Sequence, residues 1–157
     1  MSDQPQPFRV LPAVTPENEH FWRGGAEGEL RFLRCDDCDT WIHPPQPRCP
    51  ACLSKAISPQ AVSGRATVLT YTVNHQPWYP DLDPPYVVAI VALPEQDDLR
   101  LTTNIVNVDP DDVTFDLPVR VVFEEYPDPR GSVWLPFFEP DPDAPGAGAA
   151  AGGGATP

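Results

Sequence analysis

Residues 35–52, CDDCDTWIHPPQPRCPAC, contain every cysteine of the 157-residue chain. The cysteines form two CxxC pairs that are separated by ten residues, 39–48. Each pair directs two thiolates at one point, so that together they supply the four soft ligands of a closed, tetrahedral zinc site. The spacing therefore predicts a structural zinc ion bound by Cys35, Cys38, Cys49 and Cys52.

Three other chemistries use cysteine pairs of this kind. A disulfide framework needs an oxidising compartment, and the N-terminus MSDQPQPFRV lacks the basic and apolar regions of a secretory signal. A thioredoxin-like redox pair opens a helix, whereas Pro50 and the prolines before Cys49 indicate a loop. A rubredoxin-type iron site stays open as an alternative, because ligand softness and geometry suit both metals. The short gap between the pairs and the lack of glycine after either pair favour zinc.

The charge of the chain bears on its partners. Its net charge is −13, and residues 61–157 carry four Lys/Arg against fifteen Asp/Glu. Such a surface repels nucleic acid, because binding to phosphates depends on Lys and Arg displacing counterions. No apolar run approaches the eighteen or more residues of a membrane span. We therefore expect a soluble, cytoplasmic protein with neither a nucleic-acid nor a membrane partner.

Prolines and strand-like periodicity indicate a mainly β fold. The 23 prolines punctuate the chain and disfavour a helical bundle. Short strands at 29–34 and 40–43 would flank the first cysteine pair, forming a ribbon whose folding free energy comes largely from the metal. Five longer strands then predict a small barrel, and they are expected at 65–76, 86–93, 99–108, 118–125 and 132–138.

Two of these strands carry a more specific pattern. In residues 65–76 the two-residue period places one set of side chains on one face (Ala66, Val68, Thr70, Thr72 and Asn74) and another set on the opposite face (Leu69, Tyr71 and Val73). Residues 86–93 are apolar almost throughout, which is typical of a central strand covered on both faces. A turn is expected at 109–112.

A short helix is expected before the ribbon. Thr15 and Pro16 suit the N-cap and the first helical position, and Gly24-Gly25 would end the helix. It has too few apolar residues to form its own stripe, so Phe21 and Trp22 must pack against something else. Its own domain and a partner chain are both open as that surface.

Further aromatic residues mark two other candidate contact surfaces. Trp78 and Tyr79 lie in a proline-stiffened loop, which either folds over the barrel end or contacts a partner. The last strand supplies Trp134, Phe137 and Phe138. The histidines His20, His43 and His75 are scattered and favour structural roles, and only His75, beside the aromatic loop, would merit mutation.

The expected organisation has four parts. They are an N-terminal extension with the short helix at 1–28, a zinc ribbon at 29–60, a barrel at 61–139 and a flexible tail at 140–157. The tail is rich in Pro, Gly and Ala and has no side chains with which to form a core.

The chain resembles the family called domain of unknown function 35. The resemblance covers residues 17–139 and is carried, in order, by FWRGG, GELRFLRCDDCDTWIHPPQPRCPACLS, SGRATVLTYTVNH, PPYVVAIVAL, LTTNIVNVDPDD and PVRVVFEE. It implies a rubredoxin-like zinc ribbon followed by an OB-fold barrel. It also implies an accessory subunit that pairs with thiolase-like or lipid-transfer-protein-like enzymes acting on CoA thioesters, some of which are retro-aldolases of steroid side-chain degradation.

At the ribbon the chain departs from that family. Asp36, Asp37 and Asp39 stand where relatives often have basic residues or glycine, so these positions would repel the phosphates of CoA. Arg48 and Lys55, at the second cysteine pair, are the candidate phosphate contacts, with solvated surface charge as the alternative.

Independent catalysis is not expected. With all four cysteines bound to metal, no thiol is left as a nucleophile, and a closed site has no open position to activate water. Taken with this expectation, the resemblance implies as the first hypothesis a non-catalytic subunit of an acyl-CoA lyase or thiolase-like complex, with acyl-CoA at the interface. The alternatives are a free-standing acyl-CoA or lipid carrier and, least favoured, an OB-fold protein that binds single-stranded nucleic acid.

Overall fold

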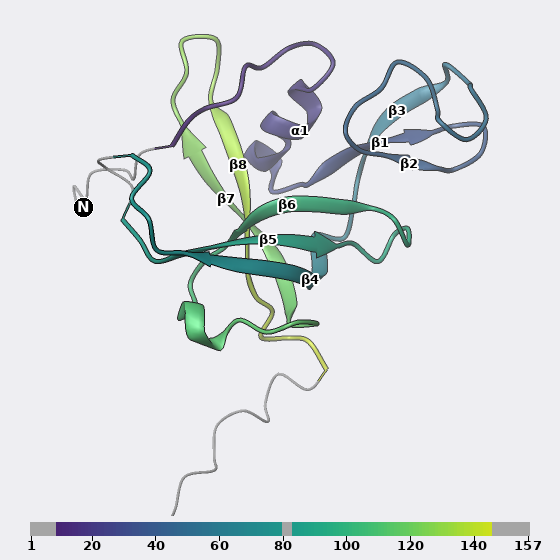
Figure 1. Ribbon diagram of the computed structural model, residues 1–157. Helices are drawn as coiled ribbons and strands as arrows, with labels where there is room; N and C mark the ends of the chain where they lie inside the picture. Colours follow the sequence, from purple (N-terminus) through teal and green to yellow (C-terminus); the bar gives the residue numbers. More distant parts are fainter. Residues whose placement is uncertain (1–8, 80–82, 146–157) are drawn as a thin grey trace, which may run out of the picture.

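The computed structural model describes residues 9–79 and 83–145. Within them a small three-stranded ribbon lies beside a five-stranded barrel, with the short helix next to both (Figure 1). The helical elements are α1 (Glu19–Arg23) and the 3-10 turns η1 (Gly24–Glu27) and η2 (Pro110–Asp112). The strands are β1 (Arg31–Cys35), β2 (Trp41–Ile42), β3 (Ile57–Ala61), β4 (Arg65–Asn74), β5 (Tyr86–Ala92), β6 (Arg100–Ile105), β7 (Pro118–Tyr126) and β8 (Val133–Pro140).

The ribbon is an antiparallel sheet in the order β2-β1-β3. The two strands expected around the first cysteine pair are present, and β3 is an addition that the sequence did not predict. Pro59 lies within β3 and interrupts its strand pattern in the sequence. The proline is tolerated because β3 is an edge strand, where a missing N–H costs no ladder hydrogen bond. β3 pairs with the whole of β1, from Arg31↔Ala61 to Cys35↔Ile57.

The barrel confirms the mainly β, OB-type fold. It closes in the order β4-β5-β6-β8-β7, with every neighbouring pair antiparallel except β6 and β8. β7 and β8 form a long hairpin that continues past the barrel toward α1 (Figure 1). The inward side chains of the strands form the main core together with Phe21, Leu30 and Phe32, which come from α1 and the start of the ribbon.

The alternation of side chains predicted along β4 is wrong in the second half of the strand. Ala66 and Val68 are buried on the same face, but a β-bulge between Val68 and Thr70 shifts the register against β5. After the bulge, Tyr71 and Val73 pack on the core instead of Thr70 and Thr72. The extra residue of the bulge changes the phase of the two-residue period.

β5 is also less enclosed than its sequence predicts. Val87, Ala89 and Val91 are buried, whereas Val88 and Ile90 on the opposite face are only half-buried. Within the described chain this strand is therefore covered fully on one face, and an apolar strip is left on the other.

The N-terminal helix differs from expectation at both ends. A turn at Thr15, whose carbonyl accepts hydrogen bonds from Asn18 and Glu19, precedes α1, and Asn18 is its N-cap. Gly24-Gly25 does not stop the chain from coiling, because it continues as η1 to Glu27. A Cβ on Gly25 would lie 2.5 Å from Cβ of Trp134 and 2.7 Å from Cδ1 of Phe123. This glycine therefore permits close packing of η1 on the β7–β8 hairpin.

At the C-terminal end, β8 ends at Pro140. The next residue, Asp141, is buried, and its N–H donates to the carbonyl of Pro118. The ordered barrel thus extends slightly past residue 139. Of the tail expected at 140–157, residues 146–157 lie outside the described residues. No helix in the described part of the chain is long and apolar enough to cross a membrane.

Candidate functional site

The four cysteines come together at one end of the ribbon. Their sulfur atoms all lie within 4.8 Å of one another, and two of the separations are 3.6 Å (Cys35 to Cys52) and 3.5 Å (Cys38 to Cys49). A tetrahedral zinc ion with Zn–S bonds of about 2.3 Å separates its sulfur ligands by about 3.8 Å. The donor set therefore fits a four-coordinate structural metal.

The two cysteine pairs have the same backbone geometry. In each, the N–H of the residue after the second cysteine donates to the carbonyl of the first cysteine, from Asp39 to Cys35 and from Leu53 to Cys49. Both Asp39 and Leu53 have a φ of 63°, in the left-handed region. This conformation turns the chain tightly enough for both thiols of a pair to point to the same side. It is reached here without the glycine that usually occupies such positions.

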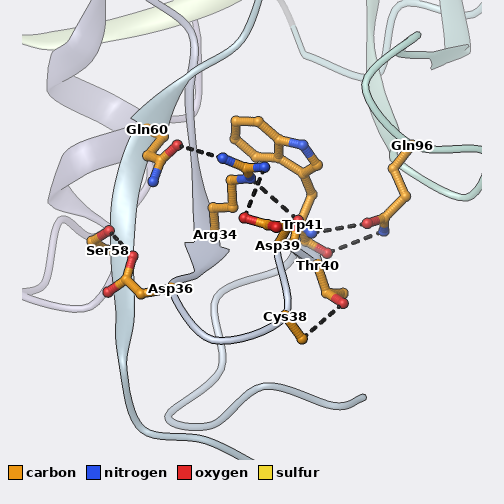
Figure 2. A network of polar contacts seen from close by, with 9 residues as sticks. All are labelled: Arg34, Asp36, Cys38, Asp39, Thr40, Trp41, Ser58, Gln60 and Gln96. Atoms are coloured by element: carbon orange, nitrogen blue, oxygen red, sulfur yellow. Dashed lines mark hydrogen bonds and ion pairs between the residues drawn. The ribbon is translucent and has the colours of Figure 1, made fainter. Parts of the chain in front are cut away.

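Polar groups around the first pair hold it in place. The Thr40 hydroxyl lies 3.2 Å from Sγ of Cys38 and, with the Thr40 backbone, lowers the pKa of that thiol to about 6. A lower pKa favours the thiolate, which is the form that binds metal. Asp36 accepts a hydrogen bond from Ser58, and Asp39 pairs with Arg34 at 3.0 Å (Figure 2). The aspartates at this end thus have structural contacts.

One side chain joins the ribbon to the barrel. Gln96, in the β5–β6 connection, accepts from the N–H of Trp41 at 2.8 Å and donates to the Trp41 carbonyl at 3.2 Å (Figure 2). Its amide therefore satisfies both backbone groups of a ribbon residue, as a neighbouring strand would. The Trp41 ring also lies under the Arg34 guanidinium, 5.4 Å from its centroid.

His43 lies where the helix, the ribbon and the barrel meet. Its ring is stacked on Phe21, with centroids 5.3 Å apart, and meets Phe32 edge-on at 4.7 Å. Burial, with a smaller contribution from His20, lowers the pKa of His43 to about 4. His43 is therefore a neutral packing residue near neutral pH, in line with the structural role expected for it.

The predicted partner-binding aromatics do not form one surface, and three of them are core residues. Phe21, Phe137 and Phe138 are exposed by only 4%, 5% and 0%, so their assignment to contact surfaces is corrected. Phe21 docks on its own domain because the Phe32 and His43 rings supply the surface that α1 lacks. Trp22, in α1, and Trp134, which lies against η1, are half-buried.

Trp78 and Tyr79 are the exposed members of that set. They are 69% and 46% exposed, and Nε1 of Trp78 donates to Oδ1 of Asn74 at 3.0 Å, which holds the indole at the end of β4. Tyr79 lines a groove of about 350 Å³ along the outer face of β5 and β6, together with Val10, Tyr86 and Val88. This groove continues the apolar strip on β5.

The two candidate phosphate contacts lie on the second cysteine pair. Arg48 and Lys55 are both exposed, and Nη1 of Arg48 donates to the Leu53 carbonyl at 3.2 Å. Their role toward CoA stays a prediction. His75, exposed at the end of β4, is remote from the cysteines in sequence and likewise keeps no assigned role.

Sequence reasoning missed Gln96 and the cleft beside it. A lone glutamine in a polar turn gives no signal that it will bridge two modules 55 residues apart in the chain. The cleft, of about 540 Å³, is lined by residues from α1, the proline run, β6 and β8. No local pattern could have predicted this, because the four segments meet only through the tertiary fold.

Ribbon and barrel together define a class: proteins with a rubredoxin-like four-cysteine ribbon followed by an OB-fold. Family models agree, since the ChsH2 rubredoxin-like zinc ribbon domain matches residues 22–58 and the ChsH2 C-terminal OB-fold domain matches residues 59–124. A solved structure titled "Ltp2-ChsH2(DUF35) aldolase" contains a chain with 35% sequence identity and a TM-score of 0.71, and the likeness covers 83% of this chain and 98% of that one. The protein belongs to this ChsH2-type DUF35 family.

Two curated relatives have names that refer to hydratases. One, a probable enoyl-CoA hydratase alpha subunit of Thermomonospora curvata, is 36% identical over 137 residues, covering 87% of this chain and 41% of the relative. The other, a 3-oxo-4,17-pregnadiene-20-carboxyl-CoA hydratase alpha subunit of Mycobacterium tuberculosis, is 33% identical over 127 residues, covering 81% and 40%. The chain thus spans about two fifths of the length of these relatives.

Proposed function

We propose that the protein is a non-catalytic accessory subunit, which binds and completes an enzyme acting on acyl-CoA thioesters. The observation that carries this proposal is the likeness, over nearly the whole of the matched chain, to a component of an aldolase whose title names two parts, Ltp2 and ChsH2. The alpha-subunit names of the two hydratase relatives also support a hetero-oligomer. We further propose that the partner has a thiolase-like fold and catalyses retro-aldol cleavage of a steroid-type side chain.

The exposed aromatic groove supports the proposal and is the contact surface we assign to the partner. Trp78, Tyr79 and Val10 are among the most exposed large apolar side chains of the described residues, and Val10 and Tyr79 line the groove on β5. Exposed aromatic residues around an apolar strip are typical of protein interfaces. Trp22 and Trp134 remain secondary candidates, because both are partly accessible.

We also propose that the metal is zinc and that it is structural. Four thiolates leave no position open for water, so the ion would stabilise the ribbon and not take part in a reaction. The ribbon, proposed to span residues 29–60, has a small core of its own around Leu33, Ile42 and Ile57, and this core supports the role of the metal in folding. Elemental analysis of the purified protein should give one zinc per chain, whereas one iron per chain would contradict the assignment.

Removal of the metal provides the folding test. We expect a Cys49→Ser variant, or the protein with a chelator, to lose amide protection across residues 29–60, while β4–β8, the proposed barrel module, keep theirs. Hydrogen exchange with mass spectrometry measures both regions in one sample. Unchanged protection of the ribbon without metal would contradict a structural role.

Co-purification from the native host tests the accessory role. The tagged, metal-loaded protein should retain a thiolase-fold enzyme in near-stoichiometric amount, identified by mass spectrometry. A Trp78→Ser/Tyr79→Ser variant should retain much less, because it removes the exposed aromatic contacts, whereas the matched control Phe115→Ser removes an exposed aromatic side chain from another loop. Failure to retain such an enzyme, with direct binding of acyl-CoA to the isolated chain, would replace the proposal with the carrier function.

A further inference from the structure

The barrel is closed by little strand pairing at the junction of β6 and β8. Within the described residues these two strands pair at a single position, Ile105↔Phe138, although β6 begins at Arg100. Pro136 of β8 faces β6 farther along, where its carbonyl accepts a hydrogen bond from the Thr103 hydroxyl at 2.9 Å. Proline has no N–H, so β8 cannot continue a regular ladder there.

This arrangement leaves backbone groups of β6 without a strand partner. The Val106 N–H donates to the Phe138 carbonyl at 2.8 Å, so the backbone of residue 106 faces β8. Successive residues of a strand direct their N–H and C=O groups to opposite sides. Residues 104, 102 and 100 therefore also face β8, while residues 101, 103 and 105 face β5. At Arg100 and Thr102, however, no β8 residue is in register.

The unpaired edge borders the 540 Å³ cleft. Arg100, Leu101 and Thr102 form one side of it, and Leu135 and Pro136 of β8 form another. The remaining wall is mainly apolar, with Phe21 and Trp22 from α1 and the prolines of the ribbon return. Its polar members are Asn18, His43 and Asp98. Residues 100–104 extend for roughly 13 Å, at about 3.3 Å per residue. This length is enough for a short strand to lie alongside.

The charge of Arg100 sets a further requirement on the segment that would occupy the cleft. Arg100 is exposed and forms no ion pair with another described residue, whereas six of the other arginines do. The nearby Asp98 carboxylate accepts a hydrogen bond from Gln96. An occupant with a carboxylate opposite Arg100 would therefore complement the cleft.

We propose that an extended, largely apolar segment of the partner enzyme, carrying an acidic residue, adds as a strand to the β6 edge between β6 and β8. Main-chain hydrogen bonds from Arg100 and Thr102 would provide affinity, and the α1 and proline walls would select the side chains. This inference rests on the accessory function proposed above. It assigns to that function a second contact surface, which adjoins the aromatic groove at Thr102.

The test uses the full metal-loaded chain and the enzyme that the wild type retains. Thr102→Pro removes the N–H that faces the cleft, and we expect the Kd for that enzyme to rise about tenfold, as for the loss of one interface hydrogen bond. Thr102→Ala is the matched control, because it keeps the N–H, and should change the Kd by less than about threefold. Arg100→Glu should also weaken binding about tenfold, whereas Arg130→Glu, on the β7–β8 turn and outside the lining of the cleft, should not.

Hydrogen exchange on the wild type tests the contact without relying on a variant that could misfold. In the wild type, the amides of residues 100–104 should exchange more slowly in the complex than in the free chain. Equal binding by Thr102→Pro and the wild type, or unchanged exchange at β6 in the complex, would overturn the strand-addition proposal while leaving the accessory function intact. Failure of the wild type to retain any enzyme would instead overturn the accessory function and this inference together.

Discussion

Leu53 shows how a single residue can be strained to build the metal site. Its φ of 63° lies in the left-handed region, which costs a residue with a Cβ about 1 kcal/mol relative to glycine. Its side chain is 66% exposed, so little packing offsets this cost. The strain is confined to the turn that aligns Cys49 and Cys52.

We predict that Leu53→Gly stabilises the metal-loaded protein by about 1 kcal/mol, because glycine adopts this conformation without strain. Leu53→Ala is the control, since it removes the side chain but keeps the Cβ. Thermal unfolding should place the midpoint of the glycine variant about 3 °C above that of the alanine variant. Equal midpoints would contradict the role assigned to the backbone.

His43 predicts a dependence of stability on pH. Its pKa is about 4 in the folded chain because of burial and of His20, and 6.5 is the ordinary value. Between these values the unfolded chain binds a proton that the folded chain does not, so stability falls as the pH falls from about 6.5 to 4.

We expect His43→Phe, which keeps an aromatic ring on Phe21, to lose roughly 2 kcal/mol less stability than the wild type over this interval. Urea unfolding at a series of pH values measures the difference. His75→Phe, which replaces an exposed histidine, should follow the wild-type curve. A His43→Phe curve as steep as that of the wild type would refute the assignment.

At the scale of elements, the N-terminal helical segment needs glycine to pack on the β7–β8 hairpin, whereas Gly24-Gly25 does not end it. η1 lies so close to β7 and β8 that a Cβ at Gly25 would overlap Trp134 and Phe123. Gly28 has a φ of 73° but no atom within 4 Å of an added Cβ, so it needs glycine only for its backbone. Glycine is therefore required at position 25 for packing and at position 28 for the backbone conformation.

Gly25→Ala should destabilise the protein by about 2–3 kcal/mol, because the ring and the hairpin must move to admit a methyl group. Gly28→Ala should cost only about 1 kcal/mol, from backbone strain alone. Chemical denaturation gives both values. Equal losses for the two variants would indicate that η1 is not tightly packed on the hairpin.

The elements that sequence reasoning recovered are those whose signal is local. The cysteine spacing, the β-branched runs and the turn at Asp109 each indicate a structure within a few residues. β3 was not predicted because Pro59 interrupts its strand pattern. The continuous alternation expected along β4 is wrong because a bulge at Leu69 leaves no clear signal in the sequence. Phe137 and Phe138 were misassigned because two adjacent aromatics in a strand imply one exposed ring, whereas the long hairpin is covered on both faces.

In the whole molecule, the junction of ribbon and barrel depends on Gln96, which makes two of the polar contacts between them. We predict that Gln96→Ala speeds exchange of the Trp41 amide and lowers stability by about 1–2 kcal/mol, since both Trp41 backbone groups lose their partner. Gln96→Glu keeps the acceptor for the Trp41 N–H and should have an intermediate effect. If exchange at Trp41 is unchanged in Gln96→Ala, the junction does not depend on this side chain.

The same junction also forms the cleft beside β6, which is the surface proposed for the partner. Residues 43–45 of the ribbon line one side of this cleft, and the barrel strands line the other. A metal that orders the ribbon would thereby shape a surface proposed for the partner. Under the proposed accessory role, the metal would thus contribute to partner binding by ordering this surface.

The most direct test of the accessory role is the activity of the retained enzyme on its acyl-CoA thioester, measured alone and with increasing amounts of this chain. We predict that the rate rises with added chain and saturates at a fixed molar ratio, as expected when one subunit completes another. A rate that is the same with and without the chain would contradict the account.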